Sequence, residues 1–307
     1  MLGDGVPRDP GKAVAWYRAA ADSGNPEAQD AMGIIYMSGD GVDRDKAAAV
    51  AWYQRAARQG NADAMFNLGT AYYNGDGVAV DDAWAFAWFT LAKQAGSGDA
   101  TKALETTQSD RKPWTAANAY KDVAGLYAKD GLFGDKPAEA ARWWLLSAQG
   151  GDPDAQIITA DIYLNGRGVP QDLVQGRHWC EEAAKVDDQR AFFCLGEVYR
   201  RGLSVPKNPK IARSWYERAA RQRNAAAIRA LAEMDVAGEG GKRDLQSACM
   251  GYAVLVLARW EKADVLRLAA LKAQMGPNDW KKVERSLSAW NVDTSKLEAA
   301  LKLAGAQ

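Results

Sequence analysis

The sequence predicts an all-α fold: a right-handed α-solenoid of stacked antiparallel helix pairs, closed by a C-terminal helical cap. Three observations predict it. A tryptophan returns every 36 residues, glycine pairs return in step with it, and no segment shows the sustained apolar/polar alternation of a β-strand. Periods of about 20–50 residues are typical of stacked repeats, in which each unit buries its apolar face against its neighbours.

The periodic tryptophans fall in two runs. Each run keeps the 36-residue spacing, and together they comprise Trp16, Trp52, Trp88, Trp143, Trp179 and Trp215. The runs are separated by 55 residues, so 19 extra residues interrupt the period near residues 97–115, with a helix expected over 100–104 and a loop over 106–113. A residue that recurs in every repeat is more often core than contact. We therefore expect these tryptophans to be buried.

The first helix of each repeat has its own signature. A large apolar residue is followed by a small one, and a tyrosine stands three residues after the small one, as in Met32, Gly33 and Tyr36. The large residue and the tyrosine are four apart and share one helix face, while the small residue lets another helix approach closely. A G-x-G pair such as Gly39 and Gly41 then turns the chain through positive φ.

The second helix of each repeat opens on an acidic N-cap and carries the tryptophan. Asp45 and Asp81 are such caps, and Gly24 and Gly60 are expected to end two of these helices in the left-handed conformation. Met1 and Leu2 stand directly before the first glycine pair, Gly3 and Gly5, so the Trp16 helix has no upstream partner and its apolar face is expected to be open. We interpret the chain as trimmed from a longer one.

The repeat pattern stops after residue 259. We assign residues 1–259 to the solenoid and residues 260–307 to capping helices, which a solenoid needs to cover its last apolar face. A helix over 260–274 is expected to break at Gly276 and Pro277. A second is expected over 279–290 with Asn278 as N-cap, and a third is expected to start at Thr294 or Ser295.

These residues resemble the Sel1-like repeat, a relative of the tetratricopeptide repeat. The segment from Ala28 to Gly60 matches nearly every position of that family's pattern, and the resemblance covers about residues 3–259. It implies a non-enzymatic bacterial adaptor or scaffold that binds a protein or peptide. It also implies a periplasmic or envelope location if a signal segment was trimmed, and a cytoplasmic one otherwise.

Charge and composition exclude several classes. The chain has 39 basic and 39 acidic residues, which disfavours nucleic acid and anionic membranes as partners. No run of about 18 apolar residues predicts a membrane span. The three cysteines, Cys180, Cys194 and Cys249, are interpreted as buried free thiols, with a Cys180–Cys194 bridge left open.

No catalytic, metal or cofactor motif is present in the sequence. The only histidine, His178, stands beside a periodic tryptophan and is interpreted as a surface or packing residue. Cys180 is two residues away, and residues at i and i+2 of a helix do not face each other. We therefore predict no enzymatic activity, no cofactor and no metal.

A partner is expected on the concave face, which the first helices line in tetratricopeptide-like stacks. The residues at the positions left free by packing are Phe66, Thr70, Tyr73, Lys121, Ile157, Asp161, Leu164, Phe193, Glu197, Arg200 and Arg201. Aromatic and arginine side chains are the usual anchors of protein contacts. The off-period Trp84, Trp114 and Trp144 are further candidates for exposed contacts. Arg200→Glu with Arg201→Glu is expected to weaken binding by about tenfold and to keep the fold.

Two alternatives remain open on the sequence. The chain could be an inhibitor, such as an immunity protein that neutralises a secreted toxin or enzyme, since the same fold suits both roles. A cell-wall or β-lactam hydrolase is a remote alternative, and loss of turnover in His178→Ala would support it. The identity of the partner and the oligomeric state are not predicted.

Overall fold

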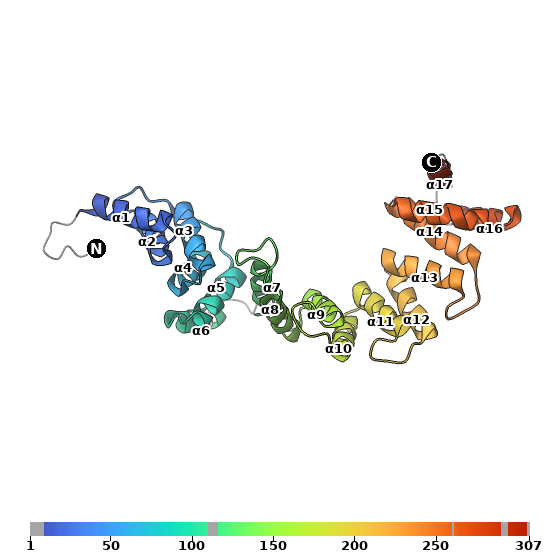
Figure 1. Ribbon diagram of the computed structural model, residues 1–307, viewed down its shortest axis with the longest axis horizontal. Coiled ribbons are helices and arrows are strands. Elements are labelled where there is room, and N and C mark those ends of the chain that lie inside the picture. Colours follow the sequence, from blue (N-terminus) through green and yellow to red (C-terminus); the bar gives the residue numbers. More distant parts are fainter. Residues whose placement is uncertain (1–8, 110–115, 260, 290–293, 306–307) are drawn as a thin grey trace. The chain divides into compact units, whose positions relative to one another are not determined.

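The structure is a computed structural model that describes residues 9–109, 116–259, 261–289 and 294–305, and all regular structure in this part is helical (Figure 1). This confirms the predicted all-α fold. The helices are α1 (Pro10–Asp22), α2 (Pro26–Ser38), α3 (Lys46–Arg58), α4 (Ala62–Asn74), α5 (Asp82–Gln94), α6 (Asp99–Ser109), α7 (Ala116–Leu126), α8 (Pro137–Gln149), α9 (Pro153–Asn165), α10 (Leu173–Ala184), α11 (Gln189–Arg201), α12 (Pro209–Arg221), α13 (Ala225–Ala237), α14 (Leu245–Arg259), α15 (Lys262–Ala273), α16 (Pro277–Ala289) and α17 (Thr294–Gly305).

The chain divides into two compact units. One comprises Met1–Ala155 with Arg167–Val169, and the other comprises Gln156–Gly166 with Pro170–Gln307. In each unit, consecutive helices joined by short loops pack against one another, as α2 does on α3 and α11 on α12 (Figure 1). The boundary at residue 259 between solenoid and cap, and the handedness of the superhelix, stay predictions.

Side-chain caps fix where the helices begin. Asp45 accepts a hydrogen bond from the Ala48 N–H at 2.9 Å, and Asp81 accepts from the N–H groups of Ala83 and Trp84. These bonds satisfy N–H groups that a helix leaves without partners in its first turn. The predicted acidic N-caps are therefore confirmed.

The glycine pairs do more than turn the chain. Gly75 and Gly77 both have positive φ, at 77°, as predicted. A Cβ atom at Gly77 would also overlap the backbone carbonyl of Lys46, at the start of α3. The second glycine of the pair is thus required because the loop presses against the preceding second helix, which the sequence alone did not indicate.

Where the small residue of a first helix is glycine, it receives an aromatic ring from the second helix. A Cβ atom at Gly33 would overlap the ring of Tyr53, and one at Gly196 would overlap that of Tyr216. Glycine therefore sets how closely the two helices of a pair approach, as the sequence predicted.

The periodic tryptophans are core residues with two exceptions. Trp52, Trp88, Trp143 and Trp179 are buried, at 8%, 2%, 1% and 7% exposure. Trp215 is half-buried and stacks on Phe192, with ring centroids 5.8 Å apart. Trp16 is 77% exposed, so burial was wrong for this member of the series, while the open face expected for its helix is confirmed.

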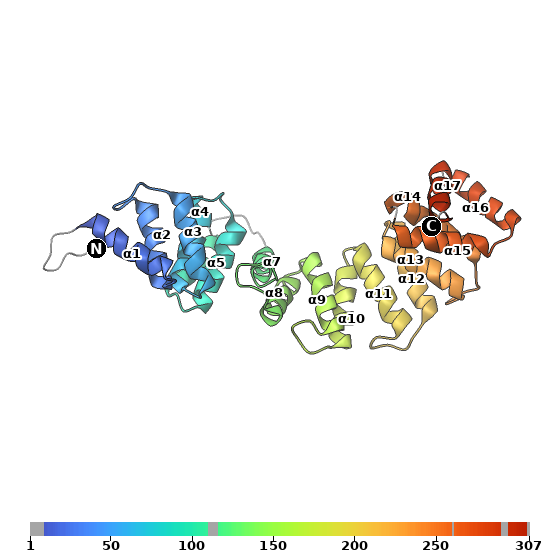
Figure 2. The ribbon, with the colours of Figure 1, turned by 45° about the horizontal axis from the view of Figure 1, so that its top comes forward.

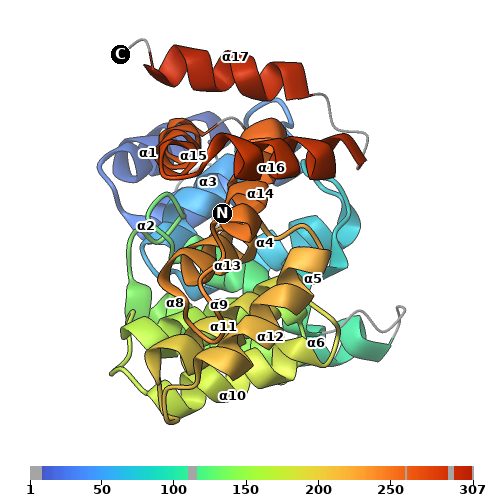
Figure 3. The same cartoon turned by 90° about the vertical axis from the view of Figure 1, so that its right-hand side faces the viewer.

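The C-terminal helices gather around α14. α15, α16 and α17 all contact it, and their apolar side chains form one buried cluster with Tyr252 and Leu255 (Figure 2). In Figure 3, α15 is seen nearly end-on while α17 lies across the view, so these two contacting helices cross. Asn278 is not an N-cap, because α16 already begins at Pro277.

The inserted segment and the segment after residue 259 differ from expectation in detail. The predicted helix over 100–104 is confirmed and runs further, as α6 extends over Asp99–Ser109 and replaces part of the expected loop. The expected helix over 260–274 is α15, which begins at Lys262 after a separate α14. Trp114 and Trp290 lie outside the described residues.

The cysteines correct the free-thiol interpretation. Cys180 on α10 and Cys194 on α11 form a disulfide, with Cα atoms 6.0 Å apart, whereas Cys249 is free and buried. The bridge links the second helix of one repeat to the first helix of the next. Burial raises the pKa of the Cys249 thiol to about 11, which disfavours its reactive thiolate.

Candidate protein-interaction site

First helices carry every predicted contact residue. The unit with α4 and α7 contributes Phe66, Thr70, Tyr73 and Lys121, and the unit with α9 and α11 contributes the other seven. Ten of the eleven side chains are half-buried, and Arg201 is exposed. Each group is positioned by packing within its own unit.

In the first unit, packing and ion pairing occupy much of the predicted surface. Phe66 packs on Phe89 of α5, with ring centroids 5.5 Å apart. The Lys121 ammonium lies 3.0 Å from an Asp152 carboxylate oxygen and 3.8 Å from Asp154. Lys121 therefore already has two carboxylate partners within the chain, which weakens it as an anchor for an acidic partner.

Beside Lys121, Asp122 carries a perturbed carboxyl group. Burial and then the nearby Asp81 carboxylate raise its pKa to about 6, although Lys121 opposes the shift. The pKa rises from 3.8, so the folded state binds more protons than the unfolded state between about pH 4 and pH 6. Ionisation of Asp122 therefore lowers stability as pH rises through that window, and the loss is complete above it.

We predict that Asp122→Asn raises the free energy of unfolding at pH 7 by about 1–2 kcal/mol, and has little effect near pH 3, where the carboxyl is mostly neutral in both states. Denaturant titrations of both proteins at several pH values measure this difference. Asp135→Asn, which changes an exposed carboxyl of the same unit, is the matched control. A gain that is equal at pH 3.5 and pH 7 would exclude the ionisation of Asp122 as its cause.

On α9, three predicted residues lie half-buried. They are Ile157, Asp161 and Leu164. Asp161 accepts a hydrogen bond of 2.6 Å from the Asn165 side chain, and a Cβ at Gly176 of α10 would come within 2.6 Å of the Leu164 side chain. Leu164 is therefore partly a packing residue.

On α11, the two neighbouring arginines have different environments. Arg200 is 21% exposed and lies 3.0 Å from Glu239 and 3.4 Å from Glu233, whereas Arg201 is 61% exposed and lies 3.9 Å from Glu197. Burial lowers the pKa of Arg200, but its hydrogen bond and charge pairing with Glu239 raise it more. Arg201 is therefore the arginine available to a partner.

The other two predicted residues of α11 contact the second helix of their pair. Phe193 packs on Tyr216, with ring centroids 5.7 Å apart, and Glu197 accepts a 2.5 Å hydrogen bond from the Tyr216 hydroxyl. Burial, followed by this bond to Glu197, raises the pKa of Tyr216. Phe193, Glu197 and Arg201 thus form one half-buried to exposed patch on α11, here called the α11 patch.

The sequence interpretation missed two charged residues of α13, the first helix of the repeat after that of α11, and one of them, Glu233, pairs with Arg200. Arg229 and Glu233 stand 36 residues after Phe193 and Glu197, so extending the same register by one period would have found them. Arg229 donates two hydrogen bonds to Asp264, of 2.8 and 2.6 Å, and one of 2.7 Å to Glu261. Glu239 lies between the two glycines of a loop, at a position that is also acidic in Asp40 and Asp76, so the repeat pattern could have indicated it.

The off-period tryptophans in the described residues are partly buried. Trp84 stacks on Tyr72 and Trp88, with centroids 5.9 and 6.4 Å apart, and Trp144 packs against the buried cluster of its unit. They are therefore packing residues more than exposed contacts.

His178 has no nucleophile beside it. Its imidazole is half exposed and lies 4.0 Å from Glu182, and the nearby Cys180 is held in the disulfide. In the described residues no group of three His, Cys, Asp or Glu side chains is placed to hold a metal ion. None of the helices described there combines the length and apolarity needed to cross a bilayer.

Helix pairs that stack through aromatic rings on glycine, with period 36, define a helical-repeat solenoid protein. The chain belongs to the Sel1 repeat family. The model of the Sel1 repeat matches residues 1–25, 26–61, 62–97, 122–152, 153–188 and 193–224. The expected resemblance is therefore confirmed.

Solved structures support the fold. The chain is similar to c5321, described as a protective antigen present in uropathogenic Escherichia coli strains and displaying an SLR fold. That match has 27% identity and a TM-score of 0.53, and it covers 98% of this chain but only 66% of that protein. A Sel1 repeat protein from Oxalobacter formigenes matches with 22% identity and a TM-score of 0.51, over 99% of this chain and 80% of the other. Among curated proteins, none matches.

A further match carries no functional argument. The immunity protein Pa5087 from Pseudomonas aeruginosa matches with 20% identity over 82% of this chain and 81% of that one. Its TM-score is only 0.29.

Proposed function

We propose that this protein is a non-enzymatic adaptor or scaffold that binds another protein or peptide on the surface of its first helices. Membership in the Sel1 repeat family supports this, because repeat solenoids present extended surfaces for partners. The observation that carries the proposal is the α11 patch, where an aromatic ring, a carboxylate and an exposed guanidinium lie on one helix face.

The contrast between the two arginines sharpens the binding test. Changing Arg200 to glutamate would place a carboxylate against Glu233 and Glu239. The double variant Arg200→Glu with Arg201→Glu, which the sequence led us to expect would keep the fold, would therefore disturb the contact of α11 with α13. Arg201 is exposed and lies near Glu197 of its own helix, so Arg201→Glu creates an i,i+4 pair of like charges that costs only about 0.2–0.5 kcal/mol and leaves the contact of α11 with α13 in place.

We predict that Arg201→Glu lowers the affinity for the natural partner by about tenfold, or about 1.4 kcal/mol, and leaves the helical content unchanged. Proteins retained from an extract of the source organism by immobilised wild type and by the variant are compared, and the retained protein is then titrated against both. Arg221→Glu, an exposed arginine on the second helix α12, is the matched control.

The same titration weighs the alternatives. Equal affinity of the wild type and Arg201→Glu would move the site away from the α11 patch. A retained toxin or secreted enzyme whose activity is blocked would favour the inhibitor role over the adaptor role.

A further inference from the structure

The last helix pair, α13 and α14, departs from the repeat at two aromatic positions. Gly251 stands 36 residues after Trp215, and Asp235 stands 36 residues after Tyr199. The backbone confirms this register. The Asn208 N–H donates to the Tyr199 carbonyl at 2.8 Å, and the Asp244 N–H donates to the Asp235 carbonyl at 2.9 Å. An indole and a phenol of the repeat are therefore both missing here.

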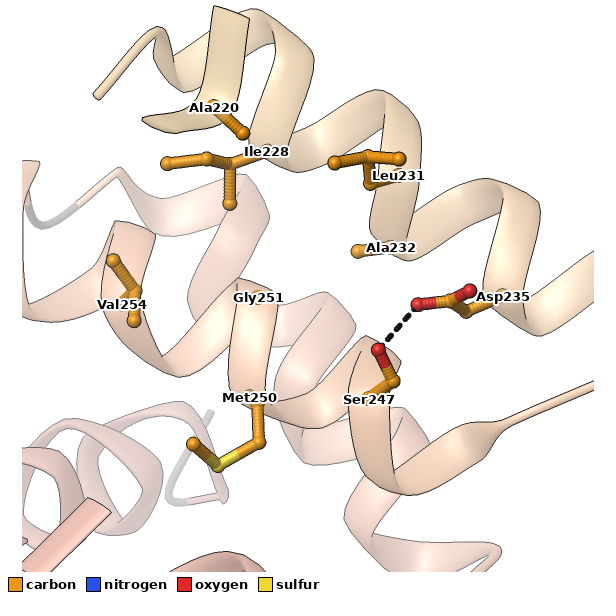
Figure 4. A pocket seen from close by; sticks show the side chains of 9 residues that line it. All are labelled: Ala220, Ile228, Leu231, Ala232, Asp235, Ser247, Met250, Gly251 and Val254. Atoms are coloured by element: carbon orange, nitrogen blue, oxygen red, sulfur yellow. Dashed lines mark hydrogen bonds between the residues drawn. The ribbon is translucent and has the colours of Figure 1, made fainter. Parts of the chain in front are cut away.

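A cavity of about 310 Å³ lies where these rings are missing (Figure 4). We call it the α13–α14 cavity. Its lining includes Ala220 of α12, Ile228 and Leu231 of α13, and Met250 and Gly251 of α14. Its size is at the lower end of that of small-molecule sites, about 300–1,000 Å³.

Filled sites elsewhere in the chain show what this lining accommodates. Trp52 belongs to one buried cluster with Ala21 and Met32. Equivalent positions lie 199 residues later, because five periods and the 19-residue insertion separate them. Ala21 corresponds to Ala220, Met32 to Leu231 and Trp52 to Gly251. The cavity therefore reproduces the walls of a tryptophan site without its tryptophan.

The neighbouring repeat supports the same equivalence. Trp215 stacks on Phe192, and Ile228 stands 36 residues after Phe192. A Cβ at Gly251 would lie 3.7 Å from Ile228 Cγ2 and 3.2 Å from Ala232 Cβ, so the missing side chain would face Ile228. Figure 4 shows Gly251 on α14, opposite Ile228 and Ala232 of α13.

The polar groups at the cavity favour a neutral aromatic occupant over a cation. Both oxygens of Asp235 already accept hydrogen bonds, from Arg213 at 2.7 Å and from Ser247 at 2.6 Å. The remaining lining is largely apolar. Among the described residues, the buried indole N–H groups of Trp88 and Trp179 likewise have no acceptor from the protein.

We propose that the α13–α14 cavity binds the indole ring of a tryptophan side chain presented by a partner polypeptide. This site goes beyond the surface of the first helices and does not depend on the α11 patch. The apolar lining removes the ring from water, and aromatic anchors in pockets commonly dominate the energetics of protein contacts.

The test uses the full chain labelled with ¹³C at its methionine methyl groups and N-acetyl-L-tryptophanamide as the probe. Because Met250 lines the cavity, its methyl signal should shift saturably with a dissociation constant in the millimolar range. The signal of Met65, which is buried in the other unit, should stay in place. An unshifted Met250 signal, or an equal shift with N-acetyl-L-leucinamide, would overturn the proposal.

Gly251→Trp supplies the missing indole from the chain itself and should weaken probe binding at least tenfold. Val186→Trp adds an indole at an exposed position of the same unit and should leave binding unchanged. If the Gly251→Trp variant loses helical structure, the Ser247→Trp variant is used instead. Residue 247 holds the repeat position of Trp84, whose ring stacks on that of Trp88, so a tryptophan at 247 should reach the space that the missing tryptophan leaves. Undiminished binding in a folded cavity variant would also overturn the proposal.

Discussion

Trp52→Ala is expected to lower the free energy of unfolding by about 3–5 kcal/mol, because truncation of a large buried aromatic removes its burial and leaves a cavity. Trp52 is 8% exposed, packs with Ala21 and Met32, and has the Arg55 guanidinium 4.4 Å from its ring centroid. The change removes contacts with both α1 and α2. Denaturant unfolding followed by circular dichroism measures it.

Trp16→Ala is the matched control, since the same residue type at the same position of the repeat is 77% exposed. It should change stability by less than about 0.5 kcal/mol. If Trp52→Ala kept full stability and instead abolished partner binding, the periodic tryptophans would be contact residues and the core interpretation would be wrong.

Arg229→Met is expected to destabilise the second unit by about 3 kcal/mol, because it leaves a buried carboxylate without its cation. Asp264 is 2% exposed and accepts two hydrogen bonds from Arg229, which also pairs with Glu261. The hydrogen bond to Asp264 is the main cause that raises the pKa of Arg229. Thermal and denaturant unfolding of the variant measure the loss.

Lys282→Met, which breaks an ion pair between two exposed side chains, is the control and should cost less than about 1 kcal/mol. Adding Asp264→Leu to Arg229→Met should recover much of the loss, since the uncompensated charge is then gone. A double variant no more stable than Arg229→Met would mean that packing by the arginine stem, not charge, was lost.

The period of the sequence determined most of the local structure. Helix starts at Asp45 and Asp81, left-handed glycines, and the glycine that receives an aromatic ring were all predictable. Each depends on residues within about one repeat, and the repeat gives every such residue the same surroundings. The sequence therefore also predicted the family, and with it the class of function that is proposed.

Contacts between repeats were decided only by the tertiary structure. Arg200 and Arg201 are adjacent and chemically identical, yet only Arg200 meets Glu233 and Glu239, which stand 33 and 39 residues later. Likewise, the Cys180–Cys194 bridge was one of two open alternatives until the helices that carry them were placed side by side. Pairing of this kind depends on side-chain positions across a helix interface, which no periodic pattern specifies.

Positions that depart from the repeat also separate what the sequence shows from what the tertiary structure decides. The sequence alone contains the replacement of tryptophan by Gly251 and of tyrosine by Asp235. Whether neighbouring side chains fill the space left behind depends on how far α13 and α14 can close, and the structure shows an unfilled cavity. A local pattern determined the helices and their register, because hydrogen bonding and capping are short-range. Tertiary packing decided which side chains are paired, covered or left facing a cavity, because those contacts join residues one or more repeats apart.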